Sequence, residues 1–187
     1  GSIAGQADMN GSAFPGVTSP QDGGGTVAYI SDCQIETDRE AVIPDSCVSS
    51  AGEKLRLYRE LDSITDEERL ARFESQLTDR FGDIPTATHE LFDIVRLRWI
   101  CIRLGFEKAI VKNGIMILQF VHNQKSAYYK SELFGRILRV STRPGSKFIF
   151  RQNNNKLSVV VRSIKDIAAA AATLRELETE AAKQPTA

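Results

Sequence analysis

The chain has 187 residues, of which 42% are hydrophobic and 26% charged, and its formal net charge is zero. This balance is typical of a folded globular domain and argues against a disordered chain or a uniformly basic nucleic-acid coat. No apolar run approaches the roughly 18 residues that a membrane-spanning helix needs. The three cysteines are odd in number and widely spaced, which argues against a disulfide framework and favours a reduced, cytoplasmic setting.

Charge is divided unevenly along the chain. Residues 1–93 carry 18 acidic side chains and seven Lys or Arg, a net charge of −11, whereas residues 94–165 carry 15 Lys or Arg and two acidic side chains, a net charge of +13. This division predicts either opposed acidic and basic faces or ion pairing between the two halves within the fold. The sequence favours neither.

The first 25 residues are rich in Gly, Ser, Pro and Asn and end in Asp-Gly-Gly-Gly. This composition predicts a flexible linker or a segment left by cloning, with the folded domain covering residues 26–187. The next stretch, TVAYISDCQIETDREAVIP, mixes β-branched and polar residues. It predicts one or two extended segments that end at Pro44.

Three helices are expected in the following stretch. The capping box Ser50-x-x-Glu53 predicts a short helix. One side of this helix is apolar: Leu55, Tyr58 and Leu61. The last of the three helices, over residues 85–104, is apolar on most sides, so we expect it to be central to the core and to end at Gly105.

The helix between these two is the most regular. The capping box Thr65-x-x-Glu68 predicts its start, and Gly82 predicts its end. Its apolar stripe repeats at helical spacing: Leu70, Phe73, Leu77 and Phe81. The segment DRFG is therefore expected to be a helix C-terminus, and no metal chemistry is implied by it.

After Gly105 the periodicity changes from helical to β. KAIVKNGIMILQFV predicts a hairpin around Asn113-Gly114, and SELFGRILRVS predicts a helix that Ser131 caps. KFIFRQNNNKLSVVVR then predicts a second hairpin, and an alanine-rich helix capped by Ser163 closes the chain. The predicted fold class is α+β, with a helical front half followed by two strand-strand-helix units.

No motif for catalysis or nucleotide binding occurs in the sequence. GxxxxGK[ST], GxGxxG, HExxH and GxSxG are all absent. His89 and His122 stand alone, and the carboxylates of Asp66, Glu67 and Glu68 fall at a helix start, where a solvated role is expected. We therefore expect no catalytic, cofactor-binding or metal-binding residue in this chain.

One segment combines cations with aromatic side chains. Its residues offer the ingredients of a single-stranded nucleic-acid or phosphate site: Lys125, Tyr128, Tyr129, Lys130 and the following Arg136. The alternative is that one tyrosine belongs to the core and the lysines solvate a loop. No RRM, KH or OB signature accompanies the segment.

Four stretches follow one another in a distinctive order: IETDREAVIPDSCVSS, KLRLYRELDSI, LARFESQLTDRFGDIP and LFDIVRLRWICIRLGFEKAIVKNG. Together they resemble the C-terminal domain of bacterial transcription-repair coupling factors, over residues 32–121. The combination is specific, although none of the four stretches is specific alone. The second strand-strand-helix unit is compatible with the resemblance.

The resemblance implies a large parent protein that translocates on double-stranded DNA with ATP, displaces stalled RNA polymerase and recruits the repair protein UvrA. ATP and magnesium would be bound by motor domains outside this chain. The resemblance also implies that this chain is a non-catalytic regulatory domain, with no membrane partner. Such a domain packs on the N-terminal UvrB-like module of the same protein and masks the surface that UvrA binds.

The same resemblance points to one helix face. The UvrA-binding surface of the family is basic, so an acidic mask would complement it. Four residues recur at intervals of four, three and four on the side away from the apolar stripe: Arg72, Gln76, Asp79 and Asp83. We predict that they bind the partner module, with Gln76 standing where the family commonly has glutamate. The alternative is that Asp79 only pairs with Arg72 or Arg80 on the helix surface.

Overall fold

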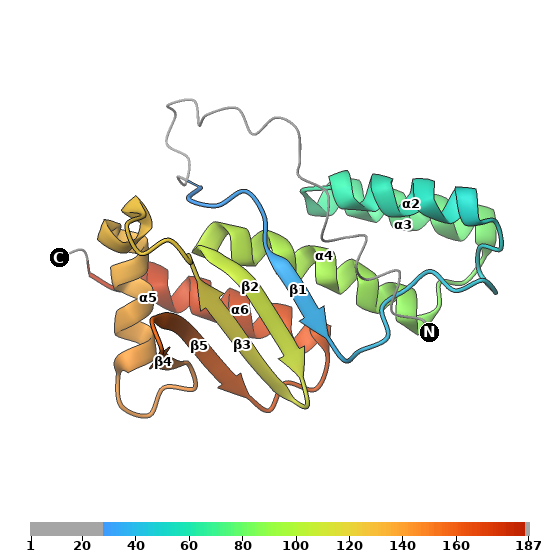
Figure 1. Ribbon diagram of the computed structural model, residues 1–187. Coiled ribbons are helices and arrows are strands. Elements are labelled where there is room, and N and C mark those ends of the chain that lie inside the picture. The colour runs from blue at the N-terminus through green and yellow to red at the C-terminus, as the bar shows by residue number, and fades with distance from the viewer. Residues whose placement is uncertain (1–27, 186–187) are drawn as a thin grey trace. The chain divides into compact units, whose positions relative to one another are not determined.

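The computed structural model describes residues 28–185, so the predicted linker at residues 1–25 lies outside the described part of the chain. Two compact units are present in it. One comprises residues 39–96, and the other comprises residues 28–38 together with residues 97–185 (Figure 1). The two units are described separately below.

The first unit is helical, as predicted for the front half of the chain. Its elements are α2 (Ala51–Ser63), α3 (Glu67–Phe81) and the beginning of α4 (Thr86–Leu104). Phe73 of α3 meets Phe92 of α4 edge to face, with ring centroids 6.0 Å apart, and both rings are almost fully buried. The predicted stripe of α3 is confirmed at Leu70, Phe73 and Leu77, whereas Phe81 is half-buried.

Capping side chains decide where these helices begin. Ser50 caps α2, since its hydroxyl accepts a hydrogen bond from the backbone N–H of Glu53, as the capping box predicts. The prediction for α3 was wrong by one residue: Asp66, not Thr65, accepts a hydrogen bond from the N–H of Arg69 at 2.8 Å. A carboxylate is favoured here because its charge also suits the positive end of the helix dipole.

The apolar side of α2 also differs from the prediction. Leu55 is 46% exposed, whereas Leu57 and Leu61 are buried. A rotation of about 100° per residue places Leu57, Tyr58 and Leu61 on one side and leaves Leu55 outside it. Tyr58 holds the preceding loop, because its hydroxyl accepts a hydrogen bond of 2.7 Å from the N–H of Ile43.

The cap of α3 gives a matched pair of substitutions. Asp66→Ala removes the acceptor for the Arg69 N–H and should lower the free energy of unfolding by about 1 kcal/mol. Thr65→Ala should change it by less than about 0.5 kcal/mol, because the exposed Thr65 hydroxyl makes no hydrogen bond within residues 28–185. Urea denaturation of both variants measures the two values. A larger loss in Thr65→Ala would contradict the assignment of the cap.

The second unit contains a five-stranded sheet in the order β1-β2-β3-β5-β4. Its strands are β1 (Gln34–Thr37), β2 (Phe106–Lys112), β3 (Ile115–Phe120), β4 (Ile149–Asn153) and β5 (Lys156–Arg162). Its helices are the short 3-10 helix η1 (Ala127–Lys130), α5 (Glu132–Thr142) and α6 (Ile167–Ala182). β1 pairs in parallel with β2, and the other neighbours are antiparallel. The two predicted strand-strand-helix units are thus confirmed, and both hairpins join one mixed sheet, so the fold class is α+β.

Both hairpin turns use the residues that the sequence predicts. Asn113 and Gly114 have φ values of 54° and 75°, and Asn154 and Asn155 have φ values of 49° and 66°. Positive φ at both central positions matches the twist of the flanking strands and is tolerated by Asn and Gly. These turns join β2 to β3 and β4 to β5.

Of the two caps predicted for the last two helices, one is confirmed and one is wrong. Ser131 caps α5, since its hydroxyl accepts a hydrogen bond from the N–H of Phe134. For α6 the predicted Ser163 is wrong: the carboxylate of Asp166 accepts a hydrogen bond from the N–H of Ala169 at 2.7 Å. Ser163 instead has a φ of 62° and lies before the helix.

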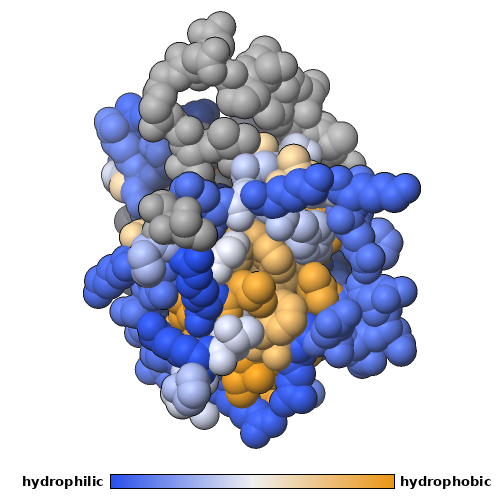
Figure 2. Space-filling model, turned by 90° about the vertical axis from the view of Figure 1, so that its left-hand side faces the viewer, coloured by the Kyte–Doolittle hydropathy of each residue, from blue (hydrophilic) through white to orange (hydrophobic). Residues whose placement is uncertain are grey.

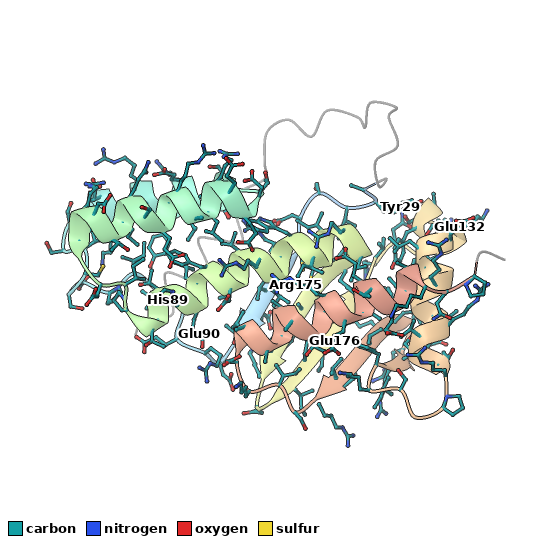
Figure 3. The ribbon with its side chains drawn as sticks, turned by 180° about the vertical axis from the view of Figure 1, so that it is seen from behind. Tyr29, His89, Glu90, Glu132, Arg175 and Glu176 are labelled. Carbon is teal, nitrogen blue, oxygen red and sulfur yellow. The ribbon has the colours of Figure 1, made fainter. Side chains whose placement is uncertain are left out.

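Helices cover one face of the sheet. In Figure 1, α6 and the last turns of α4 lie behind the strands, and Figure 3 shows these helices from the back, with the exposed Arg175 and Glu176 on α6. Strand residues that face the helices have no exposed surface, for example Ala109, Leu118 and Val159. The strand residues that alternate with them form the second face of the sheet.

Candidate partner-binding surfaces

The predicted surface on α3 is exposed in the structure. Arg72, Gln76, Asp79 and Asp83 are all exposed, and the first three lie on the side of α3 opposite the buried Leu70-Phe73-Leu77 stripe. Asp83 follows Gly82, which ends the helix with a φ of 85° and whose N–H donates a hydrogen bond to the Thr78 carbonyl at 2.8 Å. We call these four residues the α3 outer face.

The charges of the α3 outer face are only partly paired. Arg72 lies 4.0 Å from Glu68, a distance at which an exposed pair contributes little. Arg80 bonds Glu53 of α2 at 2.6 Å. Among the described residues, the side chains of Gln76, Asp79 and Asp83 have no hydrogen-bond or ion-pair partner, so Asp79 pairs with neither Arg72 nor Arg80. Two unneutralised carboxylates and one amide are therefore available to a partner with cationic side chains.

The basic and aromatic segment is arranged differently from a stacking platform. Tyr128 has no exposed surface, and its hydroxyl donates a hydrogen bond of 2.7 Å to the Leu104 carbonyl. Burial is the main cause that raises the pKa of Tyr128 far above its ordinary value. Tyr128 is therefore a core residue in this structure, and its ring is not exposed to solvent.

The other members of that segment surround the buried ring. Tyr129 is half-buried, and its hydroxyl donates a hydrogen bond to the Val121 carbonyl. Lys125 and Lys130 are exposed, and Arg136 is half-buried, 3.7 Å from Glu132. The cations Lys125 and Lys130 are thus at the surface, whereas the rings of Tyr128 and Tyr129 are buried and half-buried.

The described residues 28–185 form no metal-binding cluster. Within that range no group of three or more His, Cys, Asp or Glu side chains could hold a metal ion, and no helix is both long and apolar enough to cross a membrane. Cys33 and Cys101 are both buried, and burial beside Cys33 raises the pKa of the Cys101 thiol. A raised pKa keeps this thiol protonated and makes it a poor nucleophile.

An ion-paired carboxylate lies at the edge of the sheet. Glu36 of β1 lies 3.0 Å from the Nζ of Lys108 and 3.7 Å from the Nζ of Lys112. The hydrogen bond from Lys108 is the main cause that lowers the pKa of Glu36, although partial burial acts in the opposite direction. The pair therefore joins β1 to β2 on the face of the sheet that is turned away from α6.

This pair gives a pH-dependent prediction. Because the pKa of Glu36 is lower in the folded chain than in the unfolded chain, its ionised form stabilises the fold above about pH 4, and this contribution is lost as the pH falls through the folded pKa. Glu36→Gln should thus lose less stability than the parent chain between about pH 6 and pH 3. Urea denaturation at both pH values measures this. An equal loss in both proteins would contradict the role of the pair.

These features define an α+β domain with exposed charged surfaces, among them the α3 outer face. Residues 37–131 match the model of the TRCF domain family, about half of the chain, and the chain belongs to this family. A crystal structure of the C-terminal domain of transcription-repair coupling factor has a similar fold, with a TM-score of 0.60 and 18% identity, over 82% of this chain and 98% of that chain.

Curated relatives carry the name transcription-repair-coupling factor. The protein of Rickettsia bellii is 30% identical over 116 residues, which are 58% of this chain and 10% of the relative. The protein of Staphylococcus epidermidis strain RP62A is 26% identical over 135 residues, 72% of this chain and 11% of the relative. The protein of Escherichia coli K12 is 31% identical over 75 residues, 40% of this chain and 6% of the relative. The chain thus spans about a tenth of the length of these relatives.

Proposed function

We propose that this chain is the regulatory interaction domain of a transcription-repair coupling factor, and that it docks on the N-terminal UvrB-like module of the same protein. In this state it would mask the surface through which that module binds UvrA. The observation that carries the proposal is the α3 outer face, where Asp79 and Asp83 are exposed and unpaired among the described residues. Unpaired carboxylates complement a basic surface without first breaking an ion pair.

The proposed docking is electrostatic, which suits a mask that must open. Charges at the rim of an interface speed association and add only modestly to affinity, and salt screens their attraction. In the intact protein, tethering would raise the effective concentration of the domain to the mM range, so weak docking would suffice. Loss of docking when the parent engages RNA polymerase and DNA would then expose the site for UvrA.

No catalytic role is assigned to this chain. ATP and magnesium would be bound by motor domains of the parent protein outside the chain, and RNA polymerase and DNA would be partners of the parent. The alternative of a nucleic-acid-binding module has less support, because Tyr128 is buried and Tyr129 is half-buried. The masking role is therefore the better supported of the two.

A charge reversal on the α3 outer face tests the proposal. Asp79→Arg should leave unfolding unchanged within about 0.5 kcal/mol, because the side chain is exposed. It should weaken binding to the isolated UvrB-like module at least tenfold, because a carboxylate that faces cations becomes a cation. Calorimetry measures both proteins against the module. Glu40→Arg makes the same change of charge at another exposed position and is expected to bind like the parent chain; unchanged affinity in Asp79→Arg would rule out this face.

A further inference from the structure

Within its described residues, no helix of the second unit covers the second face of its sheet. In Figure 1 this face is turned toward the viewer, with α6 and the end of α4 behind the strands. A row of β-branched side chains crosses it from β2 to β4: Ile110, Ile117, Val160 and Ile149. Each is directly paired with the next in the sheet register, and all four are half-buried. We call these residues the aliphatic row.

Hydrophobic surface is also visible at the end of the sheet. Figure 2 views the side of the molecule that lies at the left in Figure 1, where α5 and the edge strand β4 lie, and it shows hydrophobic surface between hydrophilic margins. Ile149 and Phe150 of β4 are both half-buried. Ile115, which begins β3 on the same face as the aliphatic row, is 37% exposed. Exposed apolar surface with a polar rim is typical of an interaction site.

The rim of the aliphatic row is basic. Alternation along the strands and the strand register place five cations on this face: Lys108, Lys112, Arg151, Lys156 and Arg162. Two carboxylates of the strands lie on this side as well: Glu36, which two of these cations share, and Glu107, which lies at the bulge of β2 and lines the hollow beside Lys108. Among the described residues, Arg151, Lys156 and Arg162 have no ion-pair partner. Five cations against two carboxylates leave this face with a net positive charge.

A hollow lies beside the row at the end of β3. Its volume is about 270 Å³, and residues from four strands and the neighbouring loops line it, among them the basic Lys108 and Lys156 and the acidic Glu107. Lys108 is already bonded to Glu36, whereas Lys156 has no ion pair within residues 28–185. A carboxylate that entered the hollow would meet cations from β2 and β5, and it would also lie near Glu107, whose carboxylate accepts a hydrogen bond from the N–H of His122.

We propose that this face binds an acidic, amphipathic helix of a partner protein. Four adjacent strands about 4.8 Å apart place the ends of the aliphatic row about 14 Å from each other. Roughly three turns of an α-helix cover that distance, with apolar side chains at i, i+4, i+7 and i+11 against the row. Glu or Asp on the flanks of such a helix would meet the basic rim and the hollow.

Charge and chemistry disfavour other occupants. A second copy of this chain would bring the same positive face against itself, which is repulsive. A nucleic-acid strand would satisfy the cations, but it would place its bases on aliphatic side chains that offer no aromatic ring for stacking. The site is distinct from the α3 outer face, so this inference stands or falls independently of the masking role.

The test uses the complete 187-residue chain and a designed probe. The probe is a fluorescent peptide of about 18 residues with Leu at i, i+4, i+7 and i+11 and Glu on both flanks; the matched peptide has Lys in place of each Glu. Fluorescence anisotropy follows binding at low salt, with the chain added to about 1 mM. The Glu peptide should bind at least tenfold more tightly than the Lys peptide.

Two double variants locate the binding. Arg151→Glu/Arg162→Glu reverses two rim charges and should weaken the Glu peptide at least tenfold, while Arg59→Glu/Arg69→Glu makes the same change at exposed positions in the helical unit and should not. Circular dichroism checks that each variant is folded. Equal binding of both peptides, no binding of either, or no effect of the rim variant would overturn the proposal. Tighter binding of an oligothymidine that depends on the same arginines would assign the face to nucleic acid instead.

Discussion

Gly105→Ala should be among the most destabilising single substitutions in this chain, with an expected loss of about 3 kcal/mol or more in the free energy of unfolding. Gly105 ends α4 with a φ of 87°, a conformation that L side chains rarely adopt. A Cβ at this position would lie 2.2 Å from a ring carbon of Tyr128, so the ring or the backbone must move. Tyr128 has no exposed surface, and protein interiors are close-packed, so a shift of its ring is expected to disturb its neighbours.

A second glycine provides the matched control. Gly135 lies within α5, and a Cβ there would meet nothing within 4 Å. Gly135→Ala should therefore stabilise the chain by about 0.5–1 kcal/mol, because alanine restricts the unfolded chain and favours a helix. Urea denaturation of both variants measures their free energies of unfolding. The comparison separates the effect of adding a methyl group from the effect of the crowding and positive φ at position 105. A loss below about 1 kcal/mol in Gly105→Ala would contradict the close packing of Tyr128 on this glycine.

The second large effect is expected at Tyr128 itself. Tyr128→Ala removes a fully buried ring and should cost about 3–5 kcal/mol. Tyr128→Phe keeps the ring but leaves the Leu104 carbonyl without the 2.7 Å hydrogen bond, and should cost about 1–2 kcal/mol. A tyrosine that served only to stack on nucleic acid would be exposed, and both changes would then alter stability by less than about 0.5 kcal/mol.

These stability measurements are paired with a binding measurement. Affinity for an oligothymidine at low salt should be unchanged between the parent chain and Tyr128→Phe, because the ring is inaccessible in both. Weaker oligothymidine binding in Tyr128→Phe with normal stability would restore the nucleic-acid interpretation of this segment. Normal oligothymidine binding with reduced stability would confirm that Tyr128 serves the core.

Local chemistry explains which parts of the fold the sequence predicts. The hairpin turns depend on Asn113, Gly114, Asn154 and Asn155, whose tolerance of positive φ is a property of those residues alone. The ends of α3 and α4 likewise depend on glycine. These features lie within a few residues of one another, so no tertiary contact is needed to recognise them.

The wrong predictions have two causes. Some concern a helix start where two neighbouring residues can both act as the cap. Others concern burial that depends on contacts with residues distant in the sequence. Thr65 and Asp66 can both cap a helix, and the choice between them shifts the first turn by one residue. Tyr128 is buried because its ring fits against Gly105, 23 positions earlier in the chain, which no local pattern reveals. The positions of α3 and its exposed side were predictable, because a strong helical period separates the stripe around Leu77 from the outer face.

The basic face of the sheet was not predicted, because it too depends on contacts between residues that are distant in the sequence. Its cations lie at alternate positions on strands that are distant in sequence, for example Lys108 on β2 and Arg162 on β5. Alternation along β2 and β5 is the signal that could have revealed a charged face. The strand order β1-β2-β3-β5-β4 was also needed, because it alone brings the four members of the aliphatic row side by side.

The masking role is tested most directly by calorimetric titration of this chain with the separately expressed UvrB-like N-terminal module, at low and at moderate salt. The account predicts binding that weakens as salt is raised and that UvrA displaces. Because the natural arrangement is tethered, the same test is repeated with the two parts joined by a Gly/Ser linker, read out as protection of the module from UvrA. Salt-independent binding that UvrA does not displace, or free access of UvrA to the tethered module, would contradict it.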